Sequence, residues 1–114
     1  MPPMPSTPDR PALLLDVRAG PDGAMIVMAE GEIDLETSPE LARALQDVLE
    51  TPARVVVADL QAVSFMDSTG VSLLLTTAEQ ARRAGIELRI EPSAVVMRVL
   101  RLTGVDRVLP VSGA

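Results

Sequence analysis

A short apolar run in the middle of the chain constrains the fold more than any other stretch. Residues 54–60 read Arg-Val-Val-Val-Ala-Asp-Leu, and their β-branched composition and length suit a strand buried on both faces. Residues 71–84 then show a helical pattern that Gly85 closes. After a short linker, residues 64–70 therefore join the carboxyl end of a buried strand to the amino end of a helix. Phe65, the only aromatic residue, is expected to pack in the core.

Two residues of this junction, Asp67 and Ser68, can each cap the helix. A short side-chain oxygen at that place accepts a hydrogen bond from a backbone N–H that otherwise has no partner. Free N–H groups and the positive end of the helix dipole also favour a phosphate group there. The Ser68 hydroxyl is therefore a candidate phosphorylation site.

The rest of the chain alternates between strand and helix patterns. Further strands are predicted at residues 12–18, 24–30 and 86–91, further helices at about 37–50 and 93–103, and a closing strand or coil at 108–111. The turn at residues 20–23 makes the first two strands an antiparallel hairpin, whereas strands joined by single helices are parallel. The expected fold is an α/β mixed sheet of order β-β-α-β-α-β-α(-β), with the helices mainly on one face.

The first helix has two possible starts. Thr37 and Glu40 have the spacing of a capping box, in which the two side chains bond each other's backbone N–H groups. Alternatively, Ser38 is the cap and Pro39 occupies the first helical position. The sequence alone leaves both starts open.

Length, composition and charge limit the classes of protein to which the chain can belong. At 114 residues and 47% hydrophobic content, the chain is expected to form one folded domain at 12–114, after a Pro-rich, disordered tail at 1–11. The net charge of −6 argues against a nucleic-acid binder and against contact with an anionic membrane surface. No apolar run reaches the roughly 20 residues that span a bilayer. We therefore expect a cytoplasmic protein.

The missing residue types weigh against catalysis. The chain has no His, Cys, Tyr, Trp or Lys, so the usual general bases and activated nucleophiles are nearly absent. We expect neither enzymatic activity nor a cofactor. Asp34, Asp59 and Asp67 suggest a magnesium and phospho-aspartate site as in response-regulator receivers, but that chemistry normally also uses a Lys.

Several segments together carry a family resemblance. They are the apolar run at 54–60, the junction at 64–70 with its Asp-Ser-Thr-Gly sequence, the upstream Gly-Glu-Ile-Asp at 31–34, and the downstream Ala-Gly at 84–85, the strand after it and residues 99–105. In this context the chain resembles the sulphate-transporter and anti-sigma-factor-antagonist domain, the STAS family, over residues 12–111. The single-domain bacterial anti-sigma factor antagonists look most similar.

The resemblance implies a binding function that phosphorylation turns off. Such antagonists bind an anti-sigma factor that is also a serine/threonine kinase, and so free the sigma factor. The kinase phosphorylates the motif serine, which breaks the complex, and a phosphatase reverses this step. Carried across, Ser68 is the phosphoacceptor, and the partner-binding residues are Asp34, Asp67, Ser68, Thr69 and Gly70. Alternative functions are a stand-alone STAS subunit of an ABC-type lipid transporter and a scaffold of a stress-signalling complex.

Overall fold

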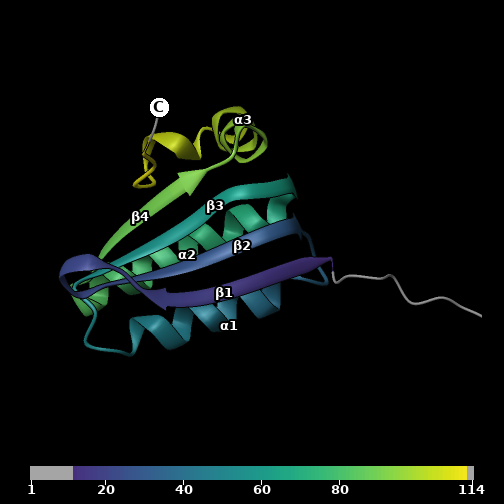
Figure 1. The fold of residues 1–114 in the computed structure, drawn as a ribbon. Helices are drawn as coiled ribbons and strands as arrows, with labels where there is room; N and C mark the ends of the chain where they lie inside the picture. The colour runs from purple at the N-terminus through teal and green to yellow at the C-terminus, as the bar shows by residue number, and fades with distance from the viewer. Residues whose placement is uncertain (1–11, 113–114) are drawn as a thin grey trace, which may run out of the picture.

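A four-stranded mixed sheet forms the centre of the molecule (Figure 1). The computed structural model describes residues 12–112, and the tail predicted at 1–11 lies outside the described residues. The strands β1 (Leu13–Ala19), β2 (Ala24–Ile33), β3 (Val55–Met66) and β4 (Glu87–Pro92) lie in this order across the sheet. β1 is antiparallel to β2, whereas β2, β3 and β4 are parallel to one another. The predicted hairpin and parallel crossovers are both confirmed.

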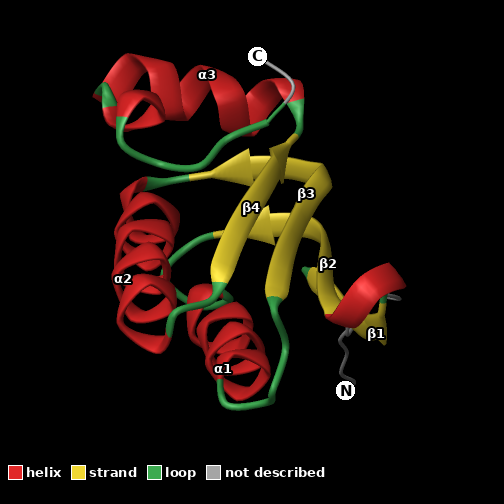
Figure 2. Cartoon of the chain, turned by 90° about the vertical axis from the view of Figure 1, so that its left-hand side faces the viewer, coloured by secondary structure: helices red, strands yellow, loops and turns green. Residues whose placement is uncertain are grey.

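Helices cover one face of this sheet. α1 (Ser38–Leu49) and α2 (Ser68–Ala84) lie on the same face, and α3 (Ala94–Thr103) crosses the end of β4 (Figure 2). The core lies between the sheet and the helices, and its largest fully buried side chains are Val27, Ile33, Leu41, Leu45, Val56, Leu60, Leu74, Ile90, Val96 and Leu100. Within residues 12–112, no α-helix covers the opposite face. The predicted α/β order and the one-sided helices are therefore confirmed.

The end of the described chain returns to the sheet through a single bridge. Val111 forms an isolated parallel bridge with Ile90. The Ile90 N–H donates to the Pro110 carbonyl, and the Ser112 N–H donates to the Ile90 carbonyl, both at 2.9 Å. A short 3₁₀ turn, Val105–Arg107, leads into this segment. The closing segment thus extends the sheet beyond β4 without forming a regular strand.

β3 is longer than its apolar run predicts. It was expected to end at Leu60, followed by a linker, but it continues to Met66. At two places, residues 59–62 and 63–65, β3 carries one residue more than β2 between successive pairings. Such β-bulges break the alternation of side chains along a strand. The pattern therefore looks like a linker although the backbone stays paired.

The bulges change which side chains of β3 are exposed. In this part of the strand the buried residues are Leu60, Val63 and Met66, at every third position. Phe65 lies between two of them and leaves 46% of its surface accessible. The expectation that Phe65 packs in the core is therefore wrong, because the second bulge keeps it outside.

Candidate functional site

Asp67 occupies the predicted junction, where β3 ends and α2 begins. It is the N-cap of α2, and its Oδ1 accepts a hydrogen bond from the Thr69 N–H at 2.9 Å and another from the Thr69 hydroxyl. The hydroxyl bond is the main cause that lowers the pKa of Asp67 below its ordinary value. Of the two possible caps, Asp67 is therefore the one used, and Ser68 is not.

Ser68 is the first residue of α2, and its side chain is exposed. Its hydroxyl forms no hydrogen bond with any residue between 12 and 112, whereas the neighbouring Thr69 hydroxyl is held by Asp67. The N–H groups that follow are already engaged, since that of Thr69 bonds the Asp67 carboxylate and that of Gly70 bonds the Asp67 carbonyl at 3.1 Å. The chain itself thus bonds most of the N–H groups that the sequence predicts to be free for a phosphate.

Asp34 organises the neighbouring loop, between β2 and α1. Its Oδ1 accepts hydrogen bonds from the N–H groups of Glu36 and Thr37, both at 3.0 Å. The Thr37 hydroxyl accepts a bond from the Asp34 N–H at 2.9 Å and donates to the Glu32 carbonyl at 2.7 Å. Because Asp34 bonds its own loop in this way, its carboxylate fixes the shape of the surface beside the junction.

Thr37 has a role that the sequence reading missed. It is the N-cap residue of α1 by position, yet its side chain forms no capping bond, and Ser38 is already helical. Of the two predicted starts, the one at Thr37 is right in position, and the one with Ser38 as the cap is wrong. The predicted capping box does not form, because the buried Thr37 hydroxyl is committed to the loop that ends β2. An Asp followed three residues later by a Thr is the signal that could have identified this turn.

The two loops are tied together at the ends of parallel strands. The Asp67 N–H donates to the Ile33 carbonyl at 3.2 Å, one step beyond the pairing of Ile33 with Met66. A Cβ at Gly70 would lie 2.6 Å from Met66 Cγ and 3.0 Å from Ile33 Cγ2, so α2 sits very close to these strand ends. The sites predicted from sequence therefore gather at one end of the sheet: Asp34, Asp67, Ser68, Thr69 and Gly70.

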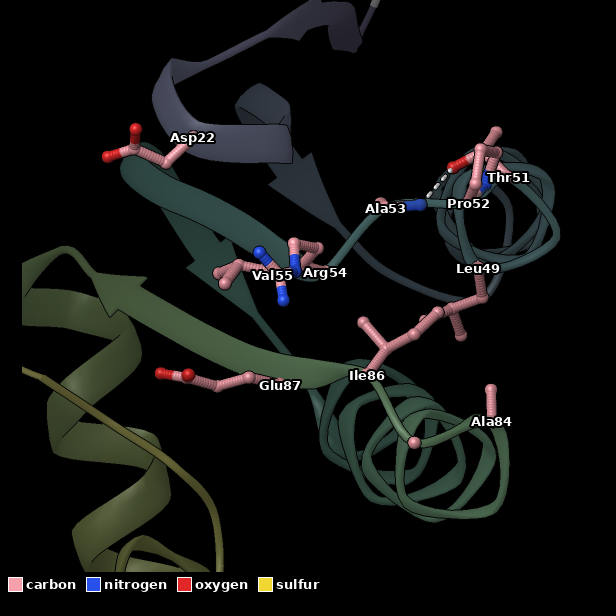
Figure 3. A pocket seen from close by; sticks show the side chains of 11 residues that line it. Asp22, Leu49, Thr51, Pro52, Ala53, Arg54, Val55, Ala84, Ile86 and Glu87 are labelled. Atoms are coloured by element: carbon pink, nitrogen blue, oxygen red, sulfur yellow. Dashed lines mark hydrogen bonds between the residues drawn. The ribbon is translucent and has the colours of Figure 1, made fainter.

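A broad hollow lies at the amino ends of β3 and β4, which is the opposite end of the sheet from Ser68, and Figure 3 shows the side chains that line it. Its lining includes Leu49, Arg54, Ile86 and Glu87, and none of the predicted site residues. The part of the chain that the structure describes also contains no group of three His, Cys, Asp or Glu residues placed to hold a metal ion.

Comparison with known proteins identifies the family. The model of the STAS domain matches residues 17–113. The chain belongs to the STAS domain family. This STAS domain is 33% identical over 89 residues to the anti-sigma-F factor antagonist RsfB of Mycobacterium tuberculosis. The aligned residues cover 75% of this chain and 70% of that protein. It is 32% identical over 87 residues to the anti-sigma-B factor antagonist of Staphylococcus aureus, covering 75% and 81% of the two chains.

The fold of this STAS domain is also seen in solved structures. The crystal structure of an anti-sigma factor antagonist from Mycobacterium paratuberculosis matches it with a TM-score of 0.81 and 30% identity, over 96% of this chain and 91% of that chain. None of the helices in residues 12–112 is long and apolar enough to cross a membrane. The family match and the solved structure both agree with the fold predicted from the sequence.

Proposed function

We propose that this STAS domain is an anti-sigma factor antagonist, and that phosphorylation of Ser68 ends its binding to an anti-sigma factor kinase. The observation that carries the proposal is the contrast between two adjacent hydroxyl groups. That of Ser68 is exposed and without a partner among the described residues, whereas that of Thr69 is bound to Asp67. The relatives in M. tuberculosis and S. aureus, both named anti-sigma factor antagonists, support the class of function.

The proposed binding surface is held in place by the contacts around Ser68. Asp67 and Gly70 fix the first turn of α2 against the strand ends, and Asp34 fixes the adjacent loop. A partner then meets a surface that needs little ordering, which lowers the entropic cost of association. Asp34, Asp67, Ser68, Thr69 and Gly70 are the residues that we assign to this contact.

In the proposed switch, this chain supplies only the acceptor for phosphoryl transfer. The Ser68 Oγ forms a bond to the γ-phosphorus of ATP while the bond from that phosphorus to the bridging oxygen breaks, and ADP leaves. The hydroxyl proton passes to a base of the kinase, since this chain has no His, Lys or Cys. A phosphatase restores the hydroxyl by hydrolysing the phosphoserine.

The added charge accounts for release without unfolding. A phosphoserine carries about −1.5 to −2 charges at neutral pH. It would stand next to Asp67, whose lowered pKa keeps the carboxylate charged, in a chain of net charge −6. A partner surface matched to the neutral hydroxyl would meet like charge or an unpaired group. Because Ser68 is exposed and is not the cap, the fold itself loses no bond.

The test of this proposal is the site of phosphate incorporation. The kinase is first captured by the full chain, identified, purified and incubated with the chain and ATP. Mass spectrometry is expected to find one phosphate, on Ser68, in the wild type and in Thr69→Ala, and none in Ser68→Ala. Phosphate on Thr69, or on no residue, would contradict the proposal.

A further inference from the structure

We infer that the partner-binding surface extends from Ser68 onto the uncovered side of the sheet, where it receives an apolar and positively charged patch of the partner. Three exposed residues, Leu14, Leu35 and Phe65, carry this inference, and we call them the apolar rim. The inference rests on the proposed function, because the partner is the same anti-sigma factor kinase.

The apolar rim lies at the same end of the sheet as Ser68. Phe65 is 46% exposed and pairs with Glu32 of β2, three residues before Ser68 along the chain. Leu35 is 74% exposed in the loop that Asp34 organises. Leu14 is 42% exposed, and because β1 is antiparallel, its start lies beside the carboxyl ends of β2 and β3. Large apolar side chains gathered on a surface mark an interaction site.

The uncovered face of the sheet offers a shaped surface next to this rim. A hollow there is lined by Leu14, Glu30, Glu32, Ala62 and Ser64, and Ser64 directly precedes Phe65. At Gly31, which also lines this hollow, β1 approaches β2 very closely. That glycine has a φ of +121°, and a Cβ there would lie 2.1 Å from the Ala12 carbonyl oxygen. None of the α-helices within residues 12–112 covers this face.

The charges around the rim specify the partner's chemistry. Residues 30–36, which end β2 and lead towards α1, contain four acidic side chains and no arginine. Among these, Glu30, Glu32 and Glu36 are exposed at the rim, and none of them forms an ion pair within residues 12–112. Complementary charge steers association and excludes partners of like sign. The occupant is therefore a protein surface in which Lys or Arg side chains surround an apolar pocket.

Affinity measurements on the kinase that phosphorylates Ser68 test this inference. Phe65→Ala and Leu35→Ala are each expected to raise the dissociation constant about tenfold, as truncated anchors at interfaces do. Leu102→Ala is the matched control, since Leu102 is 76% exposed on α3, outside the apolar rim. Thermal unfolding of each variant verifies that it is folded.

Charge variants test the second half of the inference. Glu30→Gln with Glu32→Gln is expected to weaken binding and to reduce the dependence of the dissociation constant on salt, because screening acts on charged pairs. Asp47→Asn with Glu50→Gln, at the carboxyl end of α1, removes the same charge elsewhere and is expected to leave both quantities unchanged.

The outcomes separate the two proposals. If the wild type binds no kinase and receives no phosphate, the proposed function fails and this inference fails with it. If the wild type binds and is phosphorylated on Ser68 while the Phe65, Leu35 and glutamate variants bind equally well, only the extended surface is overturned. Wild-type sedimentation as a dimer that Phe65→Ala dissociates would assign the rim to a second copy of the chain and also overturn the inference.

Discussion

The hydroxyl of Thr69 donates a hydrogen bond to the carboxylate of Asp67, which leaves Ser68 between two residues that are bound to each other. The same carboxylate accepts the Thr69 N–H and caps α2. The bond from the Thr69 N–H therefore caps the helix. The bond from the Thr69 hydroxyl lowers the pKa of Asp67 and engages one of the two adjacent hydroxyl groups. The contact distinguishes Ser68 from Thr69, although their positions in the sequence are nearly equivalent.

Replacing Asp67 by Asn should reveal the charge of this cap through the pH dependence of stability. The folded pKa of Asp67 is lowered, so its stabilising effect is complete above the unfolded pKa, about 4, and disappears as the pH falls through the folded value. Asn still caps a helix but does not titrate. Urea unfolding from pH 7 to pH 2.5 should show the wild type more stable than Asp67→Asn at pH 7, with the difference shrinking below pH 4. A difference that stays constant over this range would contradict the assigned role.

Removing the Thr37 hydroxyl should destabilise the protein more than its size suggests. Thr37→Val keeps the shape of the side chain but leaves the Glu32 carbonyl and the Asp34 N–H without their partner. Unsatisfied buried groups cost about 1–3 kcal/mol. The exposed Thr76 provides the control, since Thr76→Val should change the free energy of unfolding by no more than about 0.5 kcal/mol. Equal effects of the two substitutions in chemical denaturation would show that the loop does not depend on this hydroxyl.

A methyl group at Gly70 should destabilise the domain although alanine favours helices. Ala in place of a helical Gly gains about 1 kcal/mol from propensity. Here its Cβ would lie 2.6 Å from Met66 Cγ, and overpacking of this kind costs about 1–3 kcal/mol. Denaturant unfolding should therefore give a less stable Gly70→Ala, and the loss should be smaller when Met66 is also Ala, because neighbouring sites are not additive. A stabilised Gly70→Ala would contradict the close approach of α2 to the strand ends.

The order of elements could be predicted because its signals are local. The apolar run before the junction, the turn at residues 20–23 and the closing Gly85 each act within a few residues. The length of β3 could not be predicted, because its bulges exist only in the pairing with β2. The exposure of Phe65 depends on that pairing, so alternation along a single strand gives the wrong answer.

The candidate site, too, could be predicted only in part from the sequence. That Asp67 and Ser68 lie at a helix start follows from the strand-to-helix junction, which is a property of adjacent residues. Which of them caps the helix depends on side-chain geometry, and Thr37 acts through the Glu32 carbonyl five residues earlier. Periodicity and capping statistics describe neither contact.

The affinity of the partner kinase for three forms of the chain tests the central claim most directly. Titration calorimetry with nucleotide present compares the wild type, Ser68→Ala, and the wild type phosphorylated on Ser68. We predict that the wild type and Ser68→Ala bind with similar affinity, and that the phosphorylated form binds at least about tenfold more weakly, a loss of about 1.4 kcal/mol. Equal affinities of all three forms would contradict the switch assigned to Ser68.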